Sequence, residues 1–472
     1  MGNPLLEEHK LPPFQEIKPE HVVPAIEQLI ADNQEQIAGL LANDSIPPLE
    51  KLQKLESLED RLRHAYSPVS HLNSVVNTPE LRDAWNSCRP KLSEYATSLG
   101  QNPELFKLYK SIADSGVYND LSKSQRKAID NALRDFRLSG IDLPAEEQAR
   151  FREVGKRLSE LSGQFSDNVL DATMAWTKLI TDSSDLKGIP ESDLALLRQM
   201  AAQRDQEGYL LTLEFPSYLP VMTHCENREL RREIYEAFVT RASDTGPYAG
   251  KFDNTDTMYE LLALRKEKAG LLGYANFAEL SLATKMAQST DQVVEFLEEL
   301  ATRSKGAATA DFEALCEFAR TEYGATDIEP WDLSYYGERL KEKQYSISDE
   351  MLKPYFPAPR VISGMFEVVR RLYDINITET HEIATWHPDV TTWNVSRNGE
   401  VIARFYLDLY ARQHKQGGAW MDECRVRRIR EDGTLQLPVA YLTCNFSAPV
   451  GDKPALLNHD EVVTLFHEFG HG

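Results

Sequence analysis

Two histidines and a glutamate lie together near the carboxyl end of the sequence, in the stretch HEFGH from His467 to His471. Residues four apart share one face of an α-helix, so His467 and His471 can each direct one imidazole nitrogen to a single metal ion. Zinc binds such nitrogens at about 2.0–2.1 Å and keeps an open position in catalytic sites. Glu468 lies about 100° around the helix, where it can take a proton from a metal-bound water that attacks a peptide carbonyl. The spacing therefore predicts one Zn2+ ion bound by His467 and His471, with Glu468 as the catalytic base.

A simpler interpretation is the solvated end of a charged helix. The surrounding residues favour the metal site instead, because Asn458 followed by Glu461 predicts a capping box that starts a helix over 458–472. The other faces of this helix are apolar, with Phe466 and Phe469 among them. A solvated helix end does not need such an apolar surface.

A third protein ligand is expected, because catalytic zinc usually has three. His459 precedes His467 by eight residues, about 12 Å along a helix axis, which is too far to share an ion. The upstream acids Asp408 and Glu423 are weaker alternatives. We therefore expect the third ligand to lie beyond Gly472.

The elements that position this helix fall into two predicted regions. Residues 1–205 show apolar residues at helical spacing almost throughout and predict an N-terminal helical region. Residues 206–472 form the predicted catalytic region, in which further helices precede a small sheet over 391–446 and then the HExxH helix. The predicted fold class is therefore mainly α, with a small, mostly antiparallel sheet before the metal-binding helix.

Two hairpins are predicted within the sheet. The alternating runs 391–397 and 400–410 flank Asn398-Gly399, a dipeptide that favours the positive φ angles of a two-residue turn. A second hairpin is predicted between 424–430 and 434–446.

Three residues of the sheet have two interpretations each. Pro438 cannot donate to a ladder, which suggests an edge strand at 439–446 that could bind an extended peptide, although a core strand is an equal alternative. Asp408 could orient a ligand histidine through a hydrogen bond, or it could belong to a solvated or salt-bridged strand face. Cys444 could lie near the site and make activity sensitive to thiol reagents, although a packed, inert thiol is favoured.

Composition limits the possible partners. The 74 acidic and 52 basic residues give a formal net charge of -22, which repels nucleic acid and anionic membranes. No apolar run approaches the roughly 20 residues needed to span a bilayer, and the N-terminus lacks the pattern of a secretory signal. Five scattered cysteines without a CxxC pair indicate a reducing, cytoplasmic setting. We expect a monomer without nucleic-acid or membrane partners.

Longer stretches of the sequence resemble the thimet oligopeptidase and neurolysin family of zinc metallopeptidases, and its bacterial members in particular. The resemblance runs from the N-terminus to the last residue. The stretches that carry it are FHEFGHG (466–472), NPLLEEHKLPPFQEIKPEHVVPAIEQLI (3–30), GYANFAELSLATKMAQS (273–289), FYLDLYARQHKQGGAWMDEC (405–424) and LPVAYLTCNFSAP (437–449).

The resemblance implies a two-lobed helical fold and a cytosolic endopeptidase that cleaves internal bonds of short unfolded peptides with one zinc ion. By motif, His467 and His471 would be zinc ligands and Glu468 the general base. The third ligand of the family is a glutamate on a helix shortly after the motif. We therefore expect this chain to match the first two-thirds of a family member, truncated at the active-site helix and possessing little activity as it stands. The alternative is a non-enzymatic peptide-binding fragment without firmly bound zinc.

Overall fold

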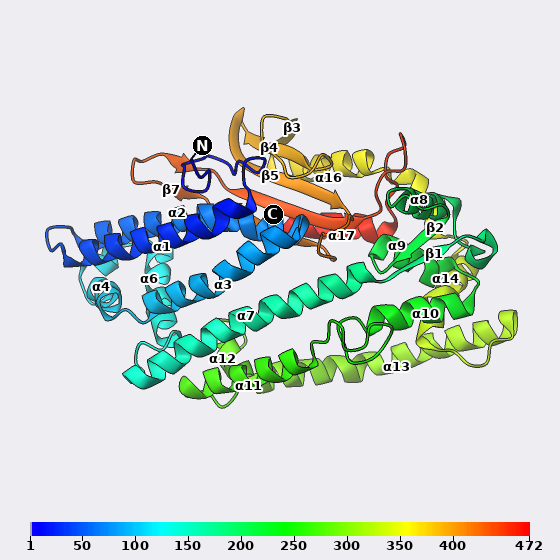
Figure 1. Cartoon of the computed structure of the whole chain (residues 1–472), viewed down its shortest axis with the longest axis horizontal. Helices are drawn as coiled ribbons and strands as arrows, with labels where there is room; N and C mark the ends of the chain where they lie inside the picture. The colour runs from blue at the N-terminus through cyan, green and yellow to red at the C-terminus, as the bar shows by residue number, and fades with distance from the viewer. Residues whose placement is uncertain (1) are drawn as a thin grey trace. The chain divides into compact units, whose positions relative to one another are not determined.

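A computed structural model of the chain describes residues 2–472 (Figure 1). The chain packs into two compact units, each assembled from three separate stretches of sequence. Among the described residues, unit 1 comprises those up to 166, 255–293 and 425–436, and unit 2 comprises residues 167–254, 294–424 and 437–472. The boundary predicted at residue 205 stays a prediction.

Unit 1 is helical apart from one short hairpin. Its elements are α1 (Pro19–Ala42), α2 (Pro48–Val75), α3 (Pro79–Gly100), α4 (Pro103–Ala113), α5 (Val117–Asp120), α6 (Lys123–Leu138), α11 (Thr255–Leu271), α12 (Phe277–Leu282), β7 (Arg428–Ile429) and β8 (Leu435–Gln436). The helices α7 (Ala145–Ala175) and α13 (Thr290–Tyr323) begin in unit 1 and end in unit 2. Helices α1 to α4 each begin with a proline at the first position, where its missing N–H leaves no intrahelical hydrogen bond unmade.

Unit 2 combines helices with the main sheet. Its helices are α8 (Glu191–Ala202), α9 (Phe215–His224), α10 (Arg228–Val239), α14 (Pro330–Tyr345), α15 (Asp349–Leu352), α16 (Ala358–Tyr373) and α17 (His459–His471). Its strands are β1 (Thr177–Ile180), β2 (Tyr209–Thr212), β3 (Asn376–Thr380), β4 (Thr391–Arg397), β5 (Glu400–Tyr410), β6 (Trp420–Arg425) and β9 (Val439–Phe446). The prediction of a mainly α fold with a small sheet before the last helix is confirmed. None of the helices in residues 2–472 is long and apolar enough to cross a membrane.

The main sheet has the strand order β3-β4-β5-β9-β6. Strands β3, β4 and β5 pair antiparallel, and the first predicted hairpin is confirmed. Asn398 and Gly399 form its turn with φ of 52° and 83°, the left-handed backbone that this dipeptide tolerates.

The prediction of an edge strand at 439–446 is wrong, because β9 lies between β5 and β6 and pairs parallel with β5. The second hairpin is also smaller than predicted, with only β7 and β8 paired across its turn. Pro438 precedes the strand, so its missing N–H interrupts no ladder, and its carbonyl oxygen accepts from the Arg404 N–H at 3.0 Å. An alternating pattern indicates which face a residue occupies but not which strand lies beside it.

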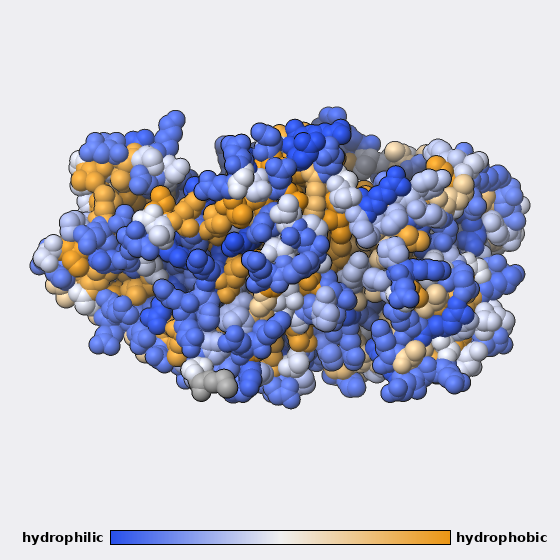
Figure 2. All heavy atoms as spheres, turned by 90° about the horizontal axis from the view of Figure 1, so that it is seen from above, coloured by the Kyte–Doolittle hydropathy of each residue, from blue (hydrophilic) through white to orange (hydrophobic). Residues whose placement is uncertain are grey.

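One face of this sheet supports both α16 and α17. Alternate residues of β5 and β9 point to this face, as period-two geometry requires. They form a buried cluster with apolar residues of the two helices: Phe405, Leu407, Leu409, Leu442, Cys444, Phe446, Ala358, Val361, Met365 and Leu465. Helix α17, the metal-motif helix that carries the HExxH residues, is therefore anchored on the sheet by its apolar residues. The molecular surface in Figure 2 is mostly polar, in keeping with the high charge of the chain.

Candidate metal and catalytic centre

Helix α17 begins at the predicted capping box. The Asn458 side-chain oxygen accepts from the Glu461 N–H at 2.8 Å, and Glu461 Oε2 accepts from the Asn458 N–H at 2.9 Å. Glu461 Oε1 also accepts from the Ser447 N–H at 2.9 Å, just after the end of β9. These bonds fix the start of the helix relative to the strand beneath it.

The two motif histidines converge at the other end of α17. The Nε2 atoms of His467 and His471 are 3.1 Å apart, and their rings meet nearly at right angles, at 83°. Two nitrogens on one tetrahedral zinc ion are expected about 3.3 Å apart. Both side chains are exposed. Their separation and orientation therefore fit a shared divalent ion without rearrangement of the helix.

Glu468 lies about 100° around the helix from His467 and is only 7% exposed. The Glu468 charge has an electrostatic effect on Cys444, a fully buried residue of β9. Burial raises the pKa of the Cys444 thiol to about 12, with a further contribution from Glu468. Cys444 is thus a packed, protonated thiol, the favoured one of the two interpretations.

The other predicted ligands lie elsewhere. His459 is the first residue of α17, and its side chain is 60% exposed. Glu423 lies on β6, exposed to solvent. No group of three His, Cys, Asp or Glu side chains within residues 2–472 is arranged to hold a metal ion. The described part of the chain thus provides two converging ligands, His467 and His471.

Asp408 belongs to a buried ion cluster, as the salt-bridged alternative predicted. Its carboxylate accepts from Arg412 at 2.6 and 2.7 Å, from Lys415 at 2.8 Å and from the Trp386 indole at 3.0 Å. Burial raises the pKa of Asp408, but Arg412 and Lys415 outweigh that effect and lower it to about 2. It forms no hydrogen bond with either motif histidine among the described residues, so its proposed orienting role has no support.

Sequence reasoning missed Arg412 and Lys415. A basic residue in a polar loop is normally read as solvated, and nothing in the spacing of this stretch indicates that Lys415 is buried. The one available signal was Asp408 itself, because a buried carboxylate needs a paired cation.

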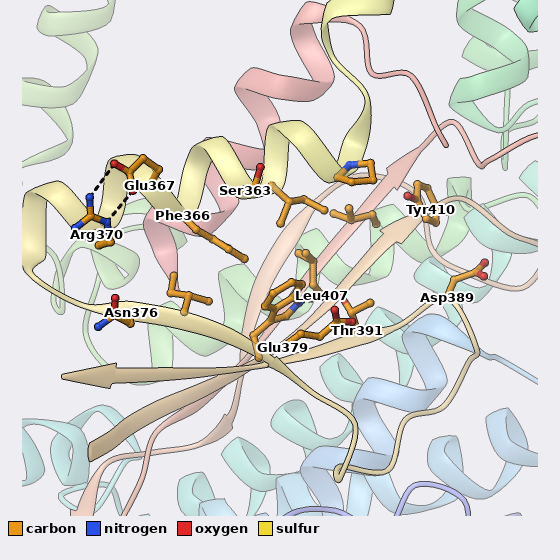
Figure 3. Close-up of a pocket in the computed structure, with 15 residues that line it drawn as sticks. Ser363, Phe366, Glu367, Arg370, Asn376, Glu379, Asp389, Thr391, Leu407 and Tyr410 are labelled. Atoms are coloured by element: carbon orange, nitrogen blue, oxygen red, sulfur yellow. Dashed lines mark hydrogen bonds and ion pairs between the residues drawn. The ribbon is translucent and has the colours of Figure 1, made fainter. Parts of the chain in front are cut away.

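A separate cavity of about 570 Å³ lies between α16 and strands β3 to β5 (Figure 3). Phe366, Trp393 and Leu407 supply apolar walls, while the Glu367–Arg370 ion pair lies at one end. None of the HExxH residues lines this cavity. The cavity and the histidine pair are therefore distinct features of the same unit.

Two family models together match most of the chain. Residues 221–472 match the model of peptidase family M3, and residues 26–148 match the model of the neurolysin/thimet oligopeptidase N-terminal domain. Oligopeptidase A of Salmonella typhimurium is 54% identical over 474 residues, and that of Escherichia coli is 53% identical. Both matches cover the whole of this chain and 70% of the relative.

The likeness to a solved structure supports a conclusion about the fold and not about function. A PZ peptidase A with an inhibitor superimposes with a TM-score of 0.50 at 15% identity, covering 97% of this chain and 64% of that one. The chain thus spans slightly less than two thirds of the solved chain. With the family models and the close relatives in agreement, the chain belongs to peptidase family M3, a family of metallopeptidase hydrolases.

Proposed function

We propose that this chain carries the zinc-binding and general-base residues of an endopeptidase that cleaves internal bonds of short unfolded peptides. The observation that carries the proposal is the 3.1 Å convergence of the His467 and His471 Nε2 atoms. The buried Glu468 carboxylate lies next to them in sequence and one third of a turn away on the helix.

In the proposed mechanism, His467 and His471 bind the metal through Nε2. A zinc ion held there would polarise the peptide carbonyl and lower the pKa of the attacking water. Glu468 takes one proton from that water as its oxygen bonds to the carbonyl carbon. When the C–N bond breaks, Glu468 returns the proton to the departing amine.

The third protein ligand is part of the proposal. We assign it to a glutamate outside residues 1–472, in line with the family resemblance and with the two converging ligands described. The five free cysteines support a reducing cytosolic setting. A monomeric state and short peptides as substrates are likewise proposed, the latter from the oligopeptidase names of the close relatives.

Metal binding is the first test, made on the 472-residue chain by competition with a zinc chelator. His471→Ala should weaken zinc binding at least about a hundredfold, because it removes one of two described ligands. His459→Ala, an exposed histidine on the same helix, is the matched control and should leave the affinity unchanged.

Hydrolysis of a quenched nonapeptide by the full-length protein is the second test. Glu468→Gln should keep zinc but lower turnover at least about a hundredfold, because a general base contributes that much or more. Asp460→Asn is the control, because the Asp460 side chain is 93% exposed on the same helix. Full turnover in Glu468→Gln would contradict the assigned role. Peptide binding without zinc and without turnover would support the alternative of a non-enzymatic binding fragment.

A further inference from the structure

The ladder between β5 and β9 is interrupted close to the metal-motif helix. Asp408 pairs with Thr443, and the next pair is Tyr410 with Phe446. One residue on β5 therefore faces two on β9, which is the geometry of a β-bulge. Backbone carbonyls left without partners at such a break are costly when buried, so another donor is needed there.

Lys415 supplies that donor. Its side chain is completely buried. Its ammonium donates to the carbonyl oxygens of Tyr410 at 2.8 Å and Cys444 at 2.6 Å, and it also contacts the Asp408 carbonyl oxygen at 3.2 Å. The Asp408 carboxylate, 2.8 Å away, balances the charge. One side chain thus bridges both strands at the break in their ladder, before pairing resumes at Tyr410 and Phe446.

A second contact holds the same loop to β9. The Asn445 amide donates to the carbonyl oxygens of Gln416 at 2.8 Å and Gly418 at 2.7 Å. This loop continues directly into β6, the outer strand beside β9. The end of β9 and the start of β6 are therefore fixed by Lys415 and Asn445 together.

This assembly contacts Cys444, a residue that packs against α17. The Cys444 side chain packs in one cluster with Leu465 of α17, and the Glu468 charge reaches it. We propose that Lys415 is a positioning residue that holds the bulged end of β9, and through Cys444 the seat of Glu468, in one geometry. The effect of Lys415 on the conformation of the end of β9 does not depend on the proposed peptidase function. Its effect on turnover rests on that function.

Cys444 itself reports on the proposal, because alkylation of its buried thiol requires local opening. Lys415→Met should raise the alkylation rate of Cys444, followed by peptide mass spectrometry at pH 7.5, at least about tenfold. Cys225, buried in another cluster of unit 2, is an internal control and should react at the wild-type rate. Lys453→Met removes an exposed lysine and should change neither rate.

The pH dependence separates a buried, titrating Lys415 amine from packing of its carbon chain alone. The groups that face the Lys415 amine are Asp408, Arg412 and Cys444. Burial lowers the pKa of Lys415 to about 8. An opened Lys415 regains its ordinary pKa and binds protons more tightly, so opening becomes less favourable as pH rises above 8. The opening constant of Lys415→Met divided by that of the wild type should therefore grow on the order of tenfold between pH 7.5 and 9.5. Cys444 is present in both proteins, so its own titration cancels.

Turnover of the full-length protein provides the last readout. Lys415→Met should lower kcat for the nonapeptide about tenfold or more while zinc affinity stays unchanged, and Lys415→Arg should restore part of kcat. Wild-type Cys444 reactivity in Lys415→Met, or a ratio of opening constants that does not change with pH, would overturn the proposal. If Lys415→Met does not fold, Asn445→Ala tests the loop contact by the same alkylation assay, and an unchanged Cys444 rate there would also count against it. A chain without peptidase activity would leave the alkylation results standing.

Discussion

Asp332 offers a quantitative test of how unit 2 is held together. Its side chain is completely buried and accepts from Arg231 at 2.7 Å and from Arg228 at 2.7 to 3.1 Å, joining α14 to α10. It also accepts from the Glu329 N–H at 3.1 Å in the capping box of α14. Arg231 is only 1% exposed, so removal of the carboxylate leaves a guanidinium buried without its counter-ion.

Asp332→Ala should therefore lower the free energy of unfolding by about 3–5 kcal/mol, the usual cost of breaking a buried ion pair from one side. Urea denaturation at pH 7 measures this change. Glu267→Ala is the matched control, because the Arg150–Glu267 pair is partly exposed and should contribute less than about 1 kcal/mol. Replacing both partners, as Arg231→Met with Asp332→Leu, should recover much of the loss, because no charge is then left unpaired.

The pH dependence has a defined sign. Burial acts to raise the pKa of Asp332, but hydrogen bonds from Arg228 and Arg231 outweigh it and hold the pKa below 3.8. The stabilisation is therefore present above that value and disappears as pH falls through the lowered pKa, so wild type and Asp332→Ala should converge in acid. Equal losses for Asp332→Ala and Glu267→Ala at pH 7 would refute the reasoning.

Three further predictions concern single elements. Gly399→Ala should destabilise the protein by about 1 kcal/mol in thermal melts, because the backbone φ at this turn position is 83°. Gly39→Ala should instead stabilise the protein by up to about 1 kcal/mol in the same melts, because Gly39 lies inside α1 and no atom lies near the new Cβ. Asn458→Ala should cost about 1 kcal/mol through loss of the α17 cap, measured by denaturation with Asp460→Ala as control, and an equal effect of both would contradict the capping role. Burial lowers the pKa of His64 to about 4, so stability should fall as pH drops from 6.5 towards 4, and His64→Gln should make that slope smaller. An NMR titration of the His64 ring near pH 6.5 would contradict this last prediction.

The sequence alone determined the features that depend on neighbouring residues. The capping box at Asn458, the one-turn spacing of His467 and His471 and the turn at Asn398-Gly399 all follow from local backbone geometry, and the structure contains each of them. Local patterns also separated the helical stretches from the sheet, because the two periods differ.

Only the tertiary structure decided which segments became neighbours. The same alternating pattern in 439–446 suits an edge strand or a central one, and it was the pairing with β5 and β6 that made β9 central. Lys415 likewise resembles any solvated loop lysine until the bulge between β5 and β9 surrounds it with acceptors. Periodicity records which side of an element is buried, whereas strand order and buried charge pairs depend on contacts between residues far apart in the chain.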